Sequence, residues 1–109
     1  MPRRREGSDT LVTTRWVHLF EEDTAQGAVY RPDSADVPLS RRPREQIELS
    51  RDGSARIFVP APDDRLSEIA ATWADENGVV VVRALGPRGG VVRELRIVEV
   101  SPDRLLVRG

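Results

Sequence analysis

The residues best able to do chemistry gather in the stretch RWVHLFEEDT, residues 15–24. Trp16, His18 and Phe20 occupy alternate positions, and three acidic residues follow them. His18 is the only histidine of the chain. Because alternate residues of a strand point to one face, Glu22 would share a face with His18 and the two aromatic rings. An imidazole that is desolvated among aromatic rings can act as a general base near neutral pH.

His18 and Glu22 are therefore the candidate catalytic residues. If this strand lines a barrel, Glu22 points into the barrel mouth, where its carboxylate would orient the imidazole or pair with an arginine. The structural alternatives are a histidine that is hydrogen-bonded or partly exposed, and an acidic strand end in water. Nothing else in the sequence marks a haem pocket that would make His18 a haem ligand.

The tetrapeptide VYRP adds a phenol and a guanidinium beside a long connection. Tyr30 is the only tyrosine, and its hydroxyl could donate a hydrogen bond to a ligand carbonyl. Arg31, Arg41 or Arg42 could clamp a carboxylate or a phosphate. The structural alternative is that Arg31 pairs with Glu22 or Asp23 across a hairpin.

The composition excludes several kinds of chemistry. The chain has no cysteine and therefore no thiol nucleophile or thiolate metal ligand, and all 17 basic residues are arginine, so no lysine can form a Schiff base. With a single histidine, a transition-metal site would need mostly carboxylate ligands. The segment GPRGG, residues 86–90, lacks the lysine of a phosphate-binding loop. We therefore expect neither a metal nor a cofactor.

Charge and hydropathy also restrict the partners. A net charge of -1 provides no general attraction for nucleic acid or acidic membranes, and the longest apolar run, Val79–Val82, is too short to span a bilayer. The basic start MPRRR is followed by no apolar segment, so we expect a cytoplasmic protein that is not exported. We expect residues 1–10 to form a disordered tail.

Turn-forming residues divide the rest of the chain into short, β-branched runs. Several runs alternate apolar and polar residues, which is the period of a sheet with one buried face. The dipeptide Asp52-Gly53 predicts a tight hairpin turn, and the apolar phase shifts within residues 95–100, which predicts a β-bulge. The eight expected strands are residues 11–20, 28–32, 45–50, 54–59, 67–75, 79–85, 91–100 and 104–108.

One of these segments also fits a helix. Within residues 63–73, Leu66, Ile69 and Trp73 recur at helical spacing, and an aspartate precedes them where a helix cap would stand. A short helical turn near residues 64–70, followed by a strand through Trp73, would satisfy both patterns.

Eight consecutive strands in 109 residues most economically close into an antiparallel up-and-down β-barrel, because closure removes exposed strand edges. Trp16 in the first strand and Arg108 in the last resemble the lipocalin-like, or calycin, pattern, in which a tryptophan packs against an arginine at the closed end of the barrel. Thr14 stands where lipocalins usually have a glycine. The combination of W-x-H-x-F-E-E-D-T, VYRP, DDR and TW resembles small uncharacterised bacterial lipocalin-like proteins. The resemblance implies one such domain over residues 11–109, with Trp16 and Arg108 in structural roles.

We therefore expect an all-β, lipocalin-like barrel that binds a modest apolar or amphipathic small molecule in its lumen. The connection at residues 31–45, with three prolines and four arginines, would lie at or over the mouth. The expected ligand-binding residues are His18, Phe20, Glu22, Tyr30, Arg31 and Arg42.

Two other functions are open. One is an enzyme of the cyclase or isomerase type from bacterial secondary metabolism, with His18 and Glu22 as its acid and base groups. The other is a barrel that is filled by its own side chains and acts as a homodimer or partner-binding protein, because eight strands from so short a chain leave a narrow lumen.

Overall fold

The structure is a computed structural model that describes residues 11–34, 37–41, 43–63 and 65–109. The expected disordered tail, residues 1–10, lies outside the described residues, as does Arg42. Within the described ranges, no helix is long and apolar enough to cross a membrane.

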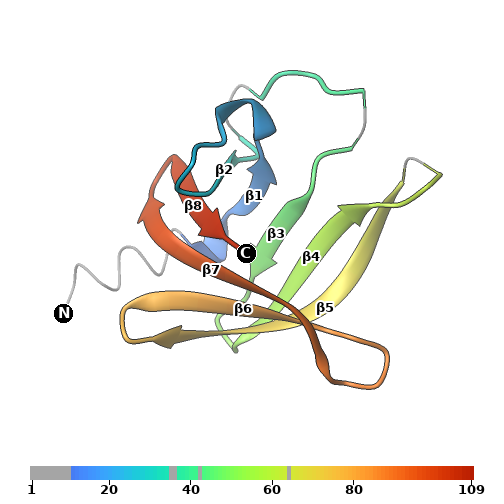
Figure 1. Cartoon of the computed structure of the whole chain (residues 1–109), viewed down its shortest axis with the longest axis vertical. Coiled ribbons are helices and arrows are strands. Elements are labelled where there is room, and N and C mark those ends of the chain that lie inside the picture. The colour runs from blue at the N-terminus through green and yellow to red at the C-terminus, as the bar shows by residue number, and fades with distance from the viewer. Residues whose placement is uncertain (1–10, 35–36, 42, 64) are drawn as a thin grey trace.

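The strands form a closed, all-antiparallel barrel (Figure 1). From β3 to β8, strands that follow one another in the chain lie side by side in up-and-down order. The ring closes through the first hairpin, because β1 pairs with both β2 and β3, and β2 pairs with β8. The strands are β1 (Arg15–His18), β2 (Ala28–Pro32), β3 (Gln46–Leu49), β4 (Ser54–Pro60), β5 (Leu66–Glu76), β6 (Val79–Leu85), β7 (Val91–Ser101) and β8 (Arg104–Arg108).

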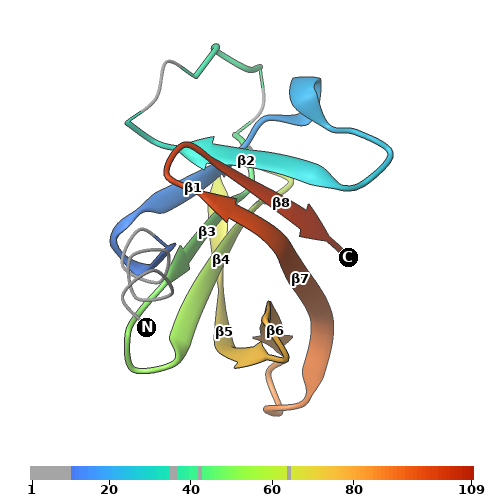
Figure 2. The same cartoon turned by 90° about the vertical axis from the view of Figure 1, so that its left-hand side faces the viewer.

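This order makes the connection between β2 and β3 a crossover. Since β2 and β3 are both antiparallel to β1, they run in the same direction, and the chain must return along the barrel between them. Its two ends are held on β1, where the Asp33 N–H donates to the Arg15 carbonyl and the His18 N–H donates to the Glu45 carbonyl. Figure 2 shows the described residues of the connection, 37–41 and 43–45, beyond β1 and β2 at one end of the barrel. The connection therefore ends beside His18.

The first strand is shorter than the sequence predicts. Residues 11–13 are helical, β1 covers only Arg15–His18, and Phe20–Glu22 form a 3-10 turn, η1. Two backbone hydrogen bonds close this turn, from Glu22 to Leu19 and from Asp23 to Phe20. A strand through these positions would have pointed acidic side chains at the apolar core, whereas the turn leaves them in contact with solvent. Alternation of faces therefore ends at His18.

Other local predictions are confirmed. Leu66–Glu76 is a strand, paired first with β4 and then with β6, as expected for residues 67–75. The short helical turn suggested near residues 64–70 is wrong for the described residues, because their backbone groups pair with β4 instead. Gly53 has a φ of 90°, as a tight turn after Asp52 requires. The pairing of β7 with β8 shifts between Ile97 and Glu99, which is the predicted bulge.

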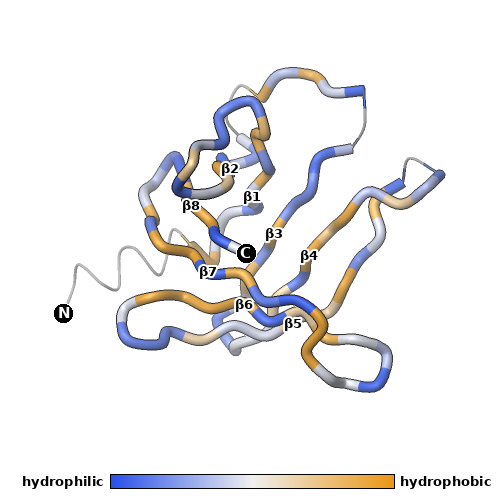
Figure 3. The backbone as a smooth tube through the Cα atoms, viewed as in Figure 1, coloured by the Kyte–Doolittle hydropathy of each residue, from blue (hydrophilic) through white to orange (hydrophobic). Residues whose placement is uncertain are grey.

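The inward-facing side chains of all eight strands pack into one apolar core. Hydrophilic residues gather at many of the turns between strands, as Figure 3 shows. Trp16 is the largest fully buried side chain, and its Nε1–H donates to the Leu11 carbonyl at 3.2 Å. The core comprises Leu11, Trp16, Tyr30, Ile47, Leu49, Ala55, Ile57, Ala71, Val82, Ala84, Leu95, Ile97, Leu105 and Val107.

The expected stack of Trp16 on Arg108 is absent. Arg108 is exposed, and its Nε–H donates to the Gln26 carbonyl at 2.7 Å. The ring order is the reason: β8 lies beside β2, where Val107 is opposite Ala28, whereas Trp16 is opposite Pro32 at the other end of β2. Trp16 therefore has a structural role without the arginine partner of the lipocalin-like pattern.

Candidate functional site

A cavity of about 310 Å³ opens at the barrel end where β1 and β4 finish and β3 starts. The crossover connection supplies part of its wall, so the cavity exists only because that segment ends beside β1. The lining combines aromatic and proline surfaces with charged groups. Its residues are His18, Phe20, Ser40, Pro43, Arg44, Glu45 and Pro60.

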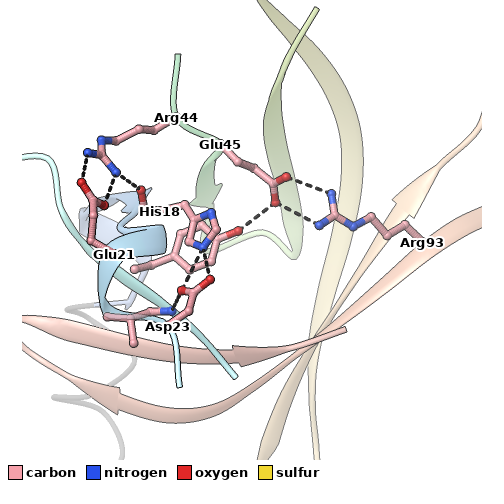
Figure 4. A network of polar contacts seen from close by, with 8 residues as sticks. His18, Glu21, Asp23, Arg44, Glu45 and Arg93 are labelled. Carbon is pink, nitrogen blue, oxygen red and sulfur yellow. Dashed lines mark hydrogen bonds and ion pairs between the residues drawn. The ribbon is translucent and has the colours of Figure 1, made fainter. Parts of the chain in front are cut away.

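His18 is held in one orientation by two neighbours (Figure 4). Its Nε2 lies 3.0 Å from both carboxylate oxygens of Asp23, and its ring stacks on that of Tyr30, with centroids 4.9 Å apart and an interplanar angle of 22°. Asp23 is itself fixed, because its Oδ1 accepts the Val29 N–H at 2.9 Å. The His18 side chain is 24% exposed, so it stays accessible from the cavity.

Tyr30 and Glu45 continue this network across the barrel. The buried Tyr30 hydroxyl donates to Glu45 Oε2 at 2.8 Å, and Arg93, from β7, donates to both Glu45 oxygens at 3.2 and 3.1 Å (Figure 4). Burial raises the pKa of Tyr30 far above its usual range, and the neighbouring Glu45 carboxylate adds to this effect. The phenol therefore stays protonated and acts as a donor to Glu45.

Arg44 joins the crossover connection to η1. Its side chain is only 7% exposed, and its guanidinium donates to both oxygens of Glu21, at 2.8 and 2.6 Å. It also donates to the carbonyls of His18 and Pro38, at 3.0 and 3.1 Å, and lies over the Phe20 ring, 5.0 Å from its centroid. The hydrogen bonds from Arg44 lower the pKa of Glu21 to about 2.

The candidate ligand residues reach different places. His18 and Phe20 line the cavity, whereas the Tyr30 hydroxyl is engaged with Glu45 instead of facing a ligand. Glu22 accepts a hydrogen bond from Arg31 Nε at 2.7 Å, which is the structural alternative predicted for this arginine. Neither residue lines the cavity.

Asp23, not Glu22, is the carboxylate that holds His18, whereas Glu22 pairs with an arginine, which is the other partner expected for it. The prediction continued the alternation of a strand past His18. In the structure η1 replaces the strand, so the three acidic side chains point in different directions and each contacts a different partner. Glu21 meets Arg44, Glu22 meets Arg31, and Asp23 meets His18.

Sequence reasoning missed four residues of the site, namely Asp23 as the imidazole partner, Arg44, Glu45 and Arg93. Arg44 and Glu45 lie at the end of the long connection, immediately before β3. Their position next to a strand start is the only feature of the sequence that could have indicated a place in the site. Arg93 lies far along the chain in β7, and nothing local to it predicts that it reaches Glu45.

The site thus combines a small apolar recess with an imidazole whose orientation is fixed by a carboxylate and a stacked ring. In the ranges that the structure describes, no three His, Cys, Asp or Glu side chains are placed together to hold a metal ion. Comparisons of the chain with models of protein families, with curated proteins and with solved structures found no match.

Proposed function

We propose that this protein binds a small amphipathic molecule in the cavity at the end of its barrel. The observation that carries the proposal is the orientation of His18, which Asp23 and Tyr30 hold at the wall of an opening of about 310 Å³. That volume is at the lower end of the range for ligand sites, which combine apolar walls with a few fixed polar groups.

The packing of the core supports a ligand at the barrel end instead of deeper in the lumen. Side chains from all eight strands meet inside the barrel, and Trp16, Ile47, Ile57 and Leu105 are fully buried there. A ligand at that depth would have to displace side chains that are already close-packed, which costs free energy. We therefore place the ligand against His18 and Phe20.

We also propose a lipocalin-like relationship for the barrel. Eight antiparallel strands around one apolar core support it, whereas the pairing of β2 with β8 departs from a continuous meander. This relationship agrees with small-molecule binding at one end of the barrel but specifies no ligand.

Titration with 2-naphthol, a neutral amphipathic molecule of suitable size, tests binding in this cavity. We expect backbone amide shifts in NMR spectra to concentrate at residues 18–20 and at Arg44 and Glu45. The variant Ser40→Trp should abolish binding, because Ser40 lines the cavity and the indole would fill it. Leu39→Trp is the matched control, since Leu39 is fully exposed and lies outside the lining. Binding that survives Ser40→Trp, or no binding by the wild type, would contradict the proposal.

A second candidate is acid–base catalysis by His18, which the contact with Asp23 favours. A carboxylate at 3.0 Å orients the imidazole for proton transfer, as a cyclase or isomerase would need. The test is elimination of 5-nitrobenzisoxazole, in which a base removes the ring C–H proton, the N–O bond breaks and a cyanophenolate forms. We expect saturable elimination that His18→Gln abolishes, whereas equal rates in the two proteins would remove this candidate and leave the binding proposal intact.

A further inference from the structure

We infer that the cavity selects ligands whose polar head donates a hydrogen bond, such as a phenol, an alcohol or an N–H group, and that His18 Nδ1 accepts it. This inference rests on the proposed binding function and specifies the chemical class of the ligand. It also makes Asp23 a positioning residue, which acts on the ligand only through His18.

The contacts of His18 determine which ring nitrogen carries the proton. Ionised carboxylate oxygens only accept hydrogen bonds, so a ring nitrogen that lies 3.0 Å from both oxygens of Asp23 must carry the hydrogen. Neutral His18 is therefore protonated at Nε2, and its Nδ1 has a free lone pair. Among the described residues, no hydrogen bond reaches Nδ1, and in Figure 4 the ring lies between Asp23 and the side of the cavity formed by Arg44 and Glu45.

Among the charged and aromatic groups around the cavity, the donors nearest to His18 are already engaged. The terminal nitrogens of Arg44 donate to Glu21 and to two backbone carbonyls. Arg93 and the Tyr30 hydroxyl both donate to Glu45. These charged and aromatic side chains therefore offer a ligand mainly hydrogen-bond acceptors, namely His18 Nδ1 and the Glu45 carboxylate.

A ligand with a carboxylate head would be disfavoured for the same reason. Its oxygens would face the lone pair of Nδ1 and the anionic Glu45, and the terminal N–H groups of Arg44 are already paired with Glu21 and two backbone carbonyls. An ether or a ketone likewise has only acceptors to offer. A hydroxyl or N–H head satisfies Nδ1, while an apolar ring attached to it can pack on Phe20, Pro43 and Pro60.

The first experiment needs no ligand. Because His18 is the only histidine, nitrogen NMR of the imidazole gives one assigned pair of signals. At a pH where the ring is neutral, we expect Nε2 to show a protonated shift and Nδ1 an unprotonated one. In Asp23→Asn this preference should weaken, because an amide can also donate. A neutral ring with its hydrogen on Nδ1 in the wild type would overturn the inference.

The second experiment compares three probes of one shape, namely 2-naphthol, 2-methoxynaphthalene and 2-naphthoate. We expect 2-naphthol to bind about tenfold more tightly than either of the others, which is the effect of one hydrogen bond to a partly buried acceptor. Its binding should shift the Nδ1 signal of His18. In His18→Phe, which keeps an aromatic ring but has no acceptor, the preference for 2-naphthol should disappear.

The outcomes separate the inference from the function on which it rests. If 2-naphthol and 2-methoxynaphthalene bind equally well, with shifts at the cavity, donor selection is wrong and the binding function stands. If 2-naphthoate binds best, selection is for an anion, and the inference is also overturned. If none of the three binds to the wild type, the proposed function itself fails.

Discussion

Arg44 is the side chain on which the shape of the cavity most depends. It is almost completely buried, and a buried guanidinium is tolerated only where its charge and its N–H groups find partners. Glu21 supplies the charge, and the carbonyls of His18 and Pro38 accept further hydrogen bonds. A single residue thereby holds η1, the end of β1 and the crossover connection in contact.

This interaction predicts a loss of stability in acid. The pKa of Glu21 lies at about 2 in the folded protein, against a usual value of 4.5, so folding favours its ionised form. The stabilisation is complete above about pH 4.5 and should disappear as the pH falls towards about 2. We expect the free energy of unfolding to decrease over that interval, measured by urea denaturation with tryptophan fluorescence. Glu21→Gln should reduce the decrease.

The reduction should be partial, because two other carboxyl groups contribute with the same sign. Hydrogen bonds from Ser54 lower the pKa of Asp52, and hydrogen bonds from Arg83 lower that of Glu76. Glu68→Gln is the control, since Glu68 is exposed and forms no ion pair with the described residues. An identical pH dependence in Glu21→Gln and Glu68→Gln would show that the Arg44 interaction does not stabilise the fold.

At the scale of elements, the contact between the first hairpin and β8 closes the ring. The backbone approaches closely there: a Cβ built on Gly27 would lie 2.6 Å from the carbonyl oxygen of Val107, and Gly27 has a φ of 155°. The Val107 carbonyl cannot easily move away from the added Cβ, because Val107 is paired with β2 on one side and with β7 on the other. Gly27 therefore permits β2 and β8 to pair.

Gly27→Ala should lower the free energy of unfolding by about 1–3 kcal/mol, the usual range for forcing extra volume into a packed site. Urea denaturation at neutral pH measures the change. Gly90→Ala is the matched control, because nothing lies within 4 Å of a Cβ at that position and its φ is not positive. Equal stability of the two variants would mean that the close approach of Gly27 to Val107 does not contribute to the stability of the barrel.

At the scale of the whole molecule, ring closure brings together Tyr30 from β2, Glu45 from the end of the crossover connection and Arg93 from β7. The phenol is buried beneath this ion pair, and its raised pKa means that the folded protein holds the proton strongly. The chain has no lysine, no cysteine and no other tyrosine. Tyr30 is therefore the only side chain expected to titrate near pH 10.

The protein should consequently lose stability in alkali. Above about pH 10 the unfolded chain releases the Tyr30 proton while the folded chain keeps it, so the free energy of unfolding should fall by about 1.4 kcal/mol per pH unit. Urea denaturation between about pH 9 and pH 11 measures this slope. Tyr30→Phe should remove it. Tyrosinate absorbance that develops in the folded wild type near pH 10, with no loss of stability, would contradict the expectation.

Most of the strands and turns could be predicted because their signals are local. Alternating apolar residues mark β3 and β4, Asp52-Gly53 marks the turn between them, and the phase shift in β7 marks its bulge. Each signal lies within about ten residues, and backbone sterics and burial of one sheet face suffice to interpret it. The closed antiparallel barrel follows, since eight such strands must hide their edges.

The order of the ring and the partners of His18 needed the folded chain. Whether β8 lies beside β1 or β2 depends on packing between residues about eighty positions apart, and no local pattern encodes that choice. Likewise, the acid that meets His18 depends on η1, a turn stabilised by Arg44 from another segment. Alternation along one strand predicts which residues share a face. It cannot predict contacts that exist only after distant segments close around a common core.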